Sequence, residues 1–405
     1  MSQITSRERV RMALRHEEAD MVPVDFGAMR STGINILAYN RLISYLSIKD
    51  DKARLYDIFQ QLAEPGKEIL RRFQGDVVQI HRLRTSFGIR NDKWKEWTLP
   101  DGSDCLVPYD FSPVRNAKNE LEIIDNGKLI ARMPEGGYYF DQVIHPYEKV
   151  VSKEDIDRIP LDPITDEELD FLRAQAAKAY NETEYALLGA FGGNVFEAGQ
   201  LDWGYDRYFA ELALDPELIH YYNDRLTKNH IRNLNRYLDA VGEYLDVIQF
   251  GDDLGTQENT QISPEMYREM IKPYHKAQFD VVHNRCPGIK VFLHSCGSIL
   301  DLIPDLIDAG VEVLNPVQLS AKKMDPVILK KEFGKYLTFW GGGCNMQTTG
   351  TFGSIEDIAR EAEELIGIFK PGGGFVFTQV HNIQANIGPE KIVTIYDTAA
   401  KFRGY

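Results

Sequence analysis

The feature that most constrains the fold is an alternation of short apolar runs with amphipathic stretches along the whole chain. Eight runs predict strands, at residues 22–27, 76–80, 186–192, 244–253, 290–297, 311–318, 337–343 and 374–382. Several are almost continuously apolar, as strands covered on both faces are. Eight strand–helix units in succession favour a closed (β/α)8 TIM barrel. The alternative is a doubly wound open sheet, but its GxGxxG signature after an early strand is missing.

Helix starts are marked by residues that cap the free N–H groups of a first turn. Ser263 opens a helical stretch over 263–282, and Asp215 opens one over 215–226. Ser354 with Asp357 resembles a capping box. These caps separate the expected helices from the loops before them, as the barrel requires.

One region, roughly residues 82–145, breaks the alternation. It contains Asp101-Gly102 and Asn126-Gly127, which are hairpin turn signals because both central positions of a type I′ turn need positive φ. We predict a small antiparallel β insertion after the second barrel strand, on the active-site side, as a lid or docking surface. No repeat or linker divides the rest, so we expect one domain over residues 1–405.

Charge and composition exclude several classes of function. The net charge of -15 argues against binding to nucleic acid and to an anionic membrane surface. The first 20 residues lack the apolar core of a secretion signal, and no run is long enough to span a bilayer. Four cysteines are too few for a disulfide framework in 405 residues. We expect a protein of the reducing cytoplasm.

Polar residues gather where the predicted strands end. In a barrel, these ends and the loops after them form the active site. A single polar residue there more often just meets water, but so many at one end indicate a site. The candidates for catalysis or substrate binding are Arg30, Asn194, Asp252, Asp253, Gln257, Gln318 and His381.

His294 and Cys296 are the strongest candidates for metal binding. Residues two apart on a strand point to the same side, so an imidazole nitrogen and a sulfur converge, which suits zinc. Gly297 then allows a sharp turn or close backbone approach. Cys344 ends a run two strands later, at the same end of the barrel, and is our third expected ligand. Three protein ligands with one open position characterise catalytic zinc.

The sequence leaves further roles open for these residues. The fourth ligand could be Asp253, Gln318 or a residue near Gln379 and His381. Cys296 could instead be a buried core cysteine beside a hydrogen-bonded histidine. A nucleophilic thiol with His294 as its base ranks lower, because no third group orients the pair.

With these residues in place, the chain resembles the uroporphyrinogen decarboxylase superfamily, whose fold is a (β/α)8 barrel. Four segments, which begin at Thr5, Phe250, Val291 and Pro371, carry the resemblance: TSRERVRMALRHEEADMVPVDFG, FGDDLGTQENTQISPEMYREMIKPYHK, VFLHSCGSILDLIPDLIDAGVEVLNP and PGGGFVFTQVHNIQ. True uroporphyrinogen decarboxylases carry an arginine-rich loop after the first strand. Here that loop reads DFGAMRSTGIN, in which Arg30 alone remains.

The resemblance is nearest to the corrinoid-dependent methyltransferase branch, which builds a zinc site from H-x-C and a later cysteine. His294 and Cys296 match the first part. The later cysteine usually lies on the last strand, where this chain has FVFTQVHN, so Cys344 stands one strand earlier.

The resemblance implies methyl transfer between a small methylated substrate or a thiol and a corrinoid protein, with Zn²⁺ as Lewis acid. The corrinoid (methylcobalamin) is expected on a separate partner protein, because this chain has no DxHxxG-type cobalamin segment. Asp252, Asp253 and Gln257 would orient the substrate or hold the loop. The alternatives are a decarboxylase of another carboxylic acid that uses Arg30, another zinc enzyme, and a non-catalytic tetrapyrrole- or corrinoid-binding protein. The sequence does not define the oligomeric state and is compatible with a homodimer.

Overall fold

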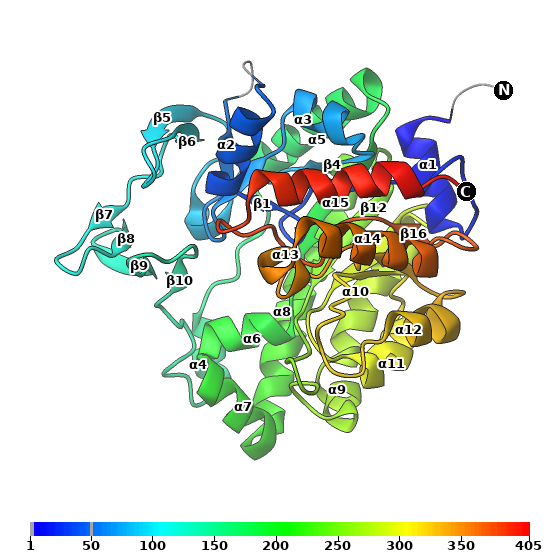
Figure 1. The fold of residues 1–405 in the computed structure, drawn as a ribbon. Coiled ribbons are helices and arrows are strands. Elements are labelled where there is room, and N and C mark those ends of the chain that lie inside the picture. Colours follow the sequence, from blue (N-terminus) through cyan, green and yellow to red (C-terminus); the bar gives the residue numbers. More distant parts are fainter. Residues whose placement is uncertain (1–3, 49–51) are drawn as a thin grey trace.

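The computed structural model describes residues 4–48 and 52–405, and its centre is a curved parallel sheet (Figure 1). Seven strands follow one another in the order β16-β15-β14-β13-β12-β11-β4. Each lies inside one of the predicted runs. Their bounds are β4 (Val77–Ile80), β11 (Ala186–Gly192), β12 (Val247–Gly251), β13 (Lys290–His294), β14 (Val313–Asn315), β15 (Thr338–Trp340) and β16 (Phe375–Val376).

The first predicted run closes the ring between β16 and β4. Val24 forms a parallel bridge with Phe377, whose N–H donates to the carbonyl of Pro23 at 2.9 Å. On the other side, the N–H of Asp76 donates to the carbonyl of Val24 at 2.7 Å. The run makes bridges rather than a continuous strand, because the N–H of Val24 goes to the Asp76 carboxylate and not to a neighbouring strand. The barrel prediction is confirmed.

Helix α1 (Ser6–Leu14) packs against the barrel from the end where the strands begin. Its buried residues Val10, Ala13 and Leu14 share one apolar cluster with side chains from the strands. The strand members of this cluster are Val77, Ala186, Leu188, Val247, Phe292, Val313, Trp340 and Val376. The barrel interior is therefore a packed core, and the opposite end remains for the site.

Helices cover the outside of the sheet. The principal ones are α5 (Asp166–Glu182), α8 (Pro216–Val241), α10 (Lys272–Arg285), α11 (Ile303–Ala309), α12 (Pro326–Phe333), α14 (Ile355–Phe369) and α15 (Pro389–Phe402). Shorter ones are α2 (Ile36–Tyr45), α3 (Lys67–Phe73), α4 (Lys153–Arg158), α6 (Phe196–Trp203), α7 (Tyr205–Leu214), α9 (Pro264–Met270) and α13 (Thr349–Phe352). No helix in residues 4–48 or 52–405 is both long and apolar enough to cross a bilayer.

The predicted caps are confirmed at Asp215, Ser263 and Ser354, and the last forms a full capping box with Asp357. The stretch 263–282 differs from the prediction, because it breaks at Ile271 into α9 and α10. A proline near the start of α10 cannot donate to the preceding turn, so a new helix begins there.

The predicted antiparallel insertion is present and extends to one side of the barrel (Figure 1). Its strands are β5 (Trp94–Thr98), β6 (Asp104–Pro108), β7 (Val114–Arg115), β8 (Leu121–Asp125), β9 (Lys128–Met133) and β10 (Asp141–Gln142). Asn126 and Gly127 both have positive φ, as the type I′ prediction requires. At 101–102 only Gly102 does, because Asp101 accepts the N–H of Ser103 in a different turn.

The insertion is joined to the loop after the first barrel segment, which the sequence did not predict. Strands β1 (Ile34–Asn35), β2 (Arg54–Asp57) and β3 (Leu62–Glu64) form one five-stranded sheet with β5 and β6. Residues before and after β4 therefore build a common wall beside the barrel mouth.

Candidate metal centre

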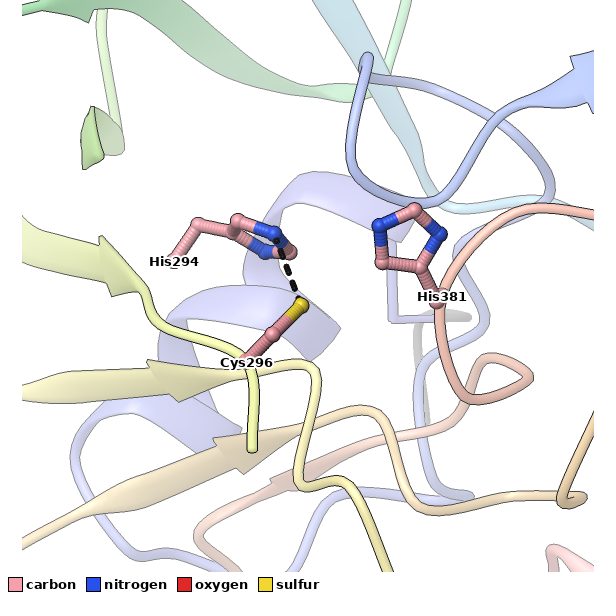
Figure 2. Close-up of side chains that lie close together, drawn as sticks. All are labelled: His294, Cys296 and His381. Atoms are coloured by element: carbon pink, nitrogen blue, oxygen red, sulfur yellow. Dashed lines mark hydrogen bonds between the residues drawn. The ribbon is translucent and has the colours of Figure 1, made fainter. Parts of the chain in front are cut away.

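His294, Cys296 and His381 meet at the mouth of the barrel, where the parallel strands end (Figure 2). One candidate ligand atom from each residue lies within 4.8 Å of the other two. Cys296 Sγ is 3.4 Å from His294 Nε2, and the two imidazole rings have centroids 5.6 Å apart. The predicted convergence of His294 and Cys296 is present in the structure, and His381 faces them from the loop after β16.

The hydrogen bond at Nδ1 of His294 fixes the tautomer and makes Nε2 the nitrogen that could bind a metal. Asn315 donates its amide N–H to the carbonyl of Trp340 at 2.7 Å, which turns the amide oxygen toward His294. Nδ1 of His294 lies 2.5 Å from that oxygen and must therefore carry the proton. In the neutral ring Nε2 then has a lone pair, and it faces the sulfur of Cys296. Metal-binding histidines are typically oriented by such an outer hydrogen bond.

Cys296 is held by its backbone and by the neighbouring loop. Its N–H donates to Asp253 Oδ1 at 2.8 Å, and that oxygen is 3.6 Å from His294 Nε2. Burial raises the pKa of the Cys296 thiol well above its usual range, and the charge of Asp253 raises it further. Without a cation beside it, Cys296 is therefore a neutral thiol. Bound zinc would replace that proton.

The turn after Cys296 depends on Gly297, as expected. Its φ is +90°, and a Cβ at this position would lie 2.3 Å from the carbonyl carbon of Gly255. Its N–H donates to Gln318 Oε1 at 2.9 Å. The loop after β13 therefore packs closely on the loop after β12, and this packing fixes the turn that follows Cys296.

The imidazole of His381 is neutral in this arrangement. Burial lowers its pKa to about 4, and the charge of His294 acts in the same direction. Its Nδ1 accepts the N–H of Asn382 at 2.7 Å, so the neutral ring carries its proton on Nε2. A metal ligand at Nε2 needs the opposite tautomer. His381 is therefore the weakest of the three candidate metal ligands. In the tautomer observed, its Nε2–H can instead donate a hydrogen bond.

Cys344 is not part of this group. Its side chain is fully buried, and its thiol interacts with Glu361 of α14. The chain turns sharply after β15, because Gly341 packs directly on the carbonyl of Pro316, where any Cβ would clash. Cys344 thus faces the helix layer rather than the barrel mouth. The geometry offers His381 in place of the third ligand that we expected.

Both carboxylate oxygens of Asp252 are occupied by hydrogen bonds within the protein. Oδ2 accepts the N–H groups of Val195 and Phe196, each at 2.8 Å, and lies 2.7 Å from His275 Nε2. Oδ1 accepts the N–H of Glu197 at 2.8 Å. The fully buried carboxylate therefore caps α6 and ties it to β12. This geometry favours the loop-holding role over substrate contact.

Glu197 and Asn194 are brought beside Asp253 by this cap. Asn194 donates to Glu197 Oε2 at 2.7 Å. Burial raises the pKa of Glu197 to about 8, and the charges of Asp253 and Asp252 raise it too. At neutral pH this carboxyl group holds a proton, and so it adds a hydrogen-bond donor rather than a second negative charge to the mouth.

The remaining predicted residues lie around the rim. Gln318 donates to Gln257, which is exposed, at 3.1 Å, and Gln257 donates to Gln347 at 2.7 Å. Arg30 lies on the opposite side, 3.1 Å from Asp57 and 4.8 Å from the ring centre of Phe59, and its charge acts on His381. The structure thus brings every predicted site residue except Cys344 to the mouth of the barrel, and it assigns Asp252 to the scaffold.

Sequence reasoning missed Tyr139, which the insertion carries to the same mouth. Its phenol interacts electrostatically with Cys296 and Asp57 and accepts a hydrogen bond from Gln384 Nε2 at 2.6 Å. Along the sequence, Tyr139 lies far from the end of any barrel strand, so no strand-end pattern could have indicated it.

Comparison with known proteins agrees with this architecture. The family model described as Uroporphyrinogen decarboxylase (URO-D) matches residues 141–402. The chain is 25% identical over 253 residues to a uroporphyrinogen decarboxylase of Vesicomyosocius okutanii, covering 61% of this chain and 69% of that one. It is 22% identical over 280 residues to the Pseudoalteromonas atlantica enzyme, covering 66% and 74%.

A solved structure of a methyltransferase from Methanosarcina mazei has a similar fold, with a TM-score of 0.62 and 17% identity over 99% of both chains. At that identity the likeness concerns the fold alone. The family model covers more than half of the chain, including β11 to β16 with both His294 and Cys296. The chain therefore belongs to the uroporphyrinogen decarboxylase (URO-D) family of enzymes.

Proposed function

We propose that this protein transfers a methyl group between a small methylated substrate or thiol and a corrinoid protein. In this proposal zinc is bound by His294 and Cys296, with His381 as the third donor. The observation that carries the proposal is the geometry of His294 and Cys296. The tautomer of His294 directs its Nε2 lone pair at the Cys296 sulfur, 3.4 Å away, in a hydrogen-bonded pair whose thiol proton zinc would replace.

The donor set fits zinc better than other common metals. One sulfur and one or two imidazole nitrogens are ligands that zinc takes in tetrahedral sites with an open position. Asp253, whose Oδ1 is 3.6 Å from His294 Nε2, lies beside the group. Zinc bound there would supply Lewis acidity to the heteroatom of the methyl donor or to an acceptor thiol.

The residues around the centre would position the substrate. Gln318 fixes the turn that presents Cys296, and the Asp252 cap holds Glu197 and Asn194 at the rim. Protonated Glu197 can donate a hydrogen bond to a bound heteroatom. The methylcobalamin-type cofactor would arrive on a separate corrinoid protein, the partner that the resemblance implies.

The charges at the mouth argue against a polycarboxylate substrate. The charged group that acts most strongly on Cys296 is the carboxylate of Asp253. Arg30, whose charge acts on His381, is already paired with Asp57. A substrate with several carboxylates would need several unpaired cations, so this arrangement favours a small neutral substrate over porphyrinogen decarboxylation.

The test is methyl transfer by zinc-loaded protein from methylcobalamin to a panel of small thiols, followed by the loss of the methylcobalamin spectrum. We expect transfer by the wild-type protein and by Cys286→Ser, a control thiol near the end of α10, far along the chain from the site. His294→Ala and Cys296→Ser should lose it. Zinc-free protein that decarboxylates a carboxylic acid, or that binds a corrinoid without turnover, would contradict the proposal.

A further inference from the structure

Tyr139 is anchored to the barrel by the residue that follows it. Phe140 is fully buried and donates its backbone N–H to the carbonyl of Phe59 at 2.9 Å. Its ring also packs against Phe87 and Phe111. Phe59 in turn lies under Arg30. The insertion therefore delivers Tyr139 to the rim from a fixed point.

The phenol of Tyr139 is held at the mouth by the loop after β16, which also carries His381. Gln384, from the loop after β16, donates to the phenol oxygen at 2.6 Å and so fixes its position. The phenol is in electrostatic range of both Cys296 and Asp57. The phenol is thus held by the loop that carries His381, three residues before Gln384.

The hydrogen bond from Gln384 uses a lone pair of the phenol oxygen and leaves the O–H proton available. Within the described residues, no hydrogen bond from this O–H to a protein acceptor is present. Burial raises the pKa of Tyr139, so the group keeps its proton at neutral pH. A held phenol with a spare proton at the barrel mouth is suited to donate to a ligand bound there.

We infer that Tyr139 is a substrate-contacting residue, which donates its phenolic hydrogen bond to the sulfur or oxygen atom bound beside Cys296. The inference rests on the proposed function and adds a role for the insertion to it. The insertion then completes the site, since it supplies a donor that no barrel strand provides. A substrate atom that accepts hydrogen bonds would be preferred over one that cannot.

The experiment uses the full-length protein loaded with Co²⁺ in place of zinc, whose visible spectrum reports the ligands around the metal. Two probes are titrated, 2-mercaptoethanol, whose bound sulfur still accepts hydrogen bonds, and imidazole, whose bound nitrogen does not. The variants are Tyr139→Phe, which removes only the hydroxyl group, and Tyr138→Phe, its 39% exposed neighbour, as the matched control. Gln384→Leu removes the group that fixes the phenol.

We expect Tyr139→Phe to bind 2-mercaptoethanol about tenfold more weakly, as loss of one hydrogen bond to a charged sulfur predicts, and imidazole unchanged. Gln384→Leu should show a smaller loss, and Tyr138→Phe none. Unchanged binding of 2-mercaptoethanol by Tyr139→Phe overturns the inference alone. So does an equal loss of both probes, because Tyr139 would then act through packing. Failure of the wild-type protein to bind Co²⁺ contradicts the proposed function itself, and the inference falls with it.

Discussion

The two ends of the barrel use buried charge in opposite ways. At the end where the strands begin, Asp76 accepts from Arg9 Nη1 at 2.6 Å, from Val24 N–H at 2.9 Å and from Arg403 at 3.4 Å. At the mouth, His294 Nε2 faces only the Cys296 thiol, whose proton a metal would replace, and the Tyr139 O–H has no acceptor among the described residues. Burial is common to both ends. Spare hydrogen-bonding or ligand capacity is what distinguishes the candidate site from the scaffold.

The largest expected effect on stability is at the closed end. Asp76→Ala should lower the free energy of unfolding by about 3–5 kcal/mol, because it breaks a buried ion pair with Arg9 and Arg403 and leaves Arg9 with only the partly exposed Asp20. Zinc content of the folded fraction should stay at the wild-type level. Urea denaturation and metal analysis check this. Asp253→Ala is the matched change at the mouth, where the side chain is 32% exposed, and should cost much less.

If Asp253→Ala destabilised the protein as much as Asp76→Ala, Asp253 would have a structural role equal to that of Asp76. The proposed difference between the two ends of the barrel would then be wrong.

Asp252 tests the same contrast within the mouth, since it is the scaffold residue there. Asp252→Ala leaves three backbone N–H groups of the α6 start and His275 without an acceptor, and we expect a loss of about 2–3 kcal/mol in unfolding free energy. Zinc should remain, because His294, Cys296 and His381 come from other loops. A variant of normal stability that had lost zinc would instead make Asp252 part of the metal centre.

A further prediction concerns pH. Because the folded pKa of Glu197, about 8, exceeds its usual value of 4.5, the folded protein binds more protons than the unfolded chain between those values. Its contribution to stability therefore falls as pH rises from about 4.5 to 8. Glu197→Gln should flatten the melting temperature over this range. Glu258→Gln, in the loop after β12, is the control: its side chain is 74% exposed, and the change should leave the pH dependence of the melting temperature unchanged.

An unchanged pH profile in Glu197→Gln would show that Glu197 ionises normally, and that the mouth carries more negative charge than a protonated Glu197 implies.

Much of the fold was predictable because local pattern and global architecture agree. Each parallel strand lies inside a predicted run, and the Asn126-Gly127 turn follows from the φ angles that only such residues accept readily. The strands β2 and β3 were not predicted, since each is short, and β2 depends on pairing with the distant strand β6. Pairing between distant segments leaves little trace in either segment alone.

The candidate site was predictable only where one strand supplies the geometry. His294 and Cys296 converge because two-residue spacing and Gly297 determine their directions. Cys344 and His381 both follow strands, and nothing in the sequence shows that the turn at Gly341 directs one outward while the other faces the mouth. Tyr139 reaches the site from the insertion, whose docking depends on tertiary packing.

The most direct test of the proposed metal centre is the zinc content of anaerobically purified wild-type protein beside four variants. We predict about one zinc per chain in the wild type and in Cys344→Ser. We predict none in His294→Ala or Cys296→Ser, and weaker retention in His381→Ala, whose tautomer makes it the weakest donor. Absence of zinc from the wild type, or its loss from Cys344→Ser while His381→Ala keeps it fully, would contradict the proposed centre.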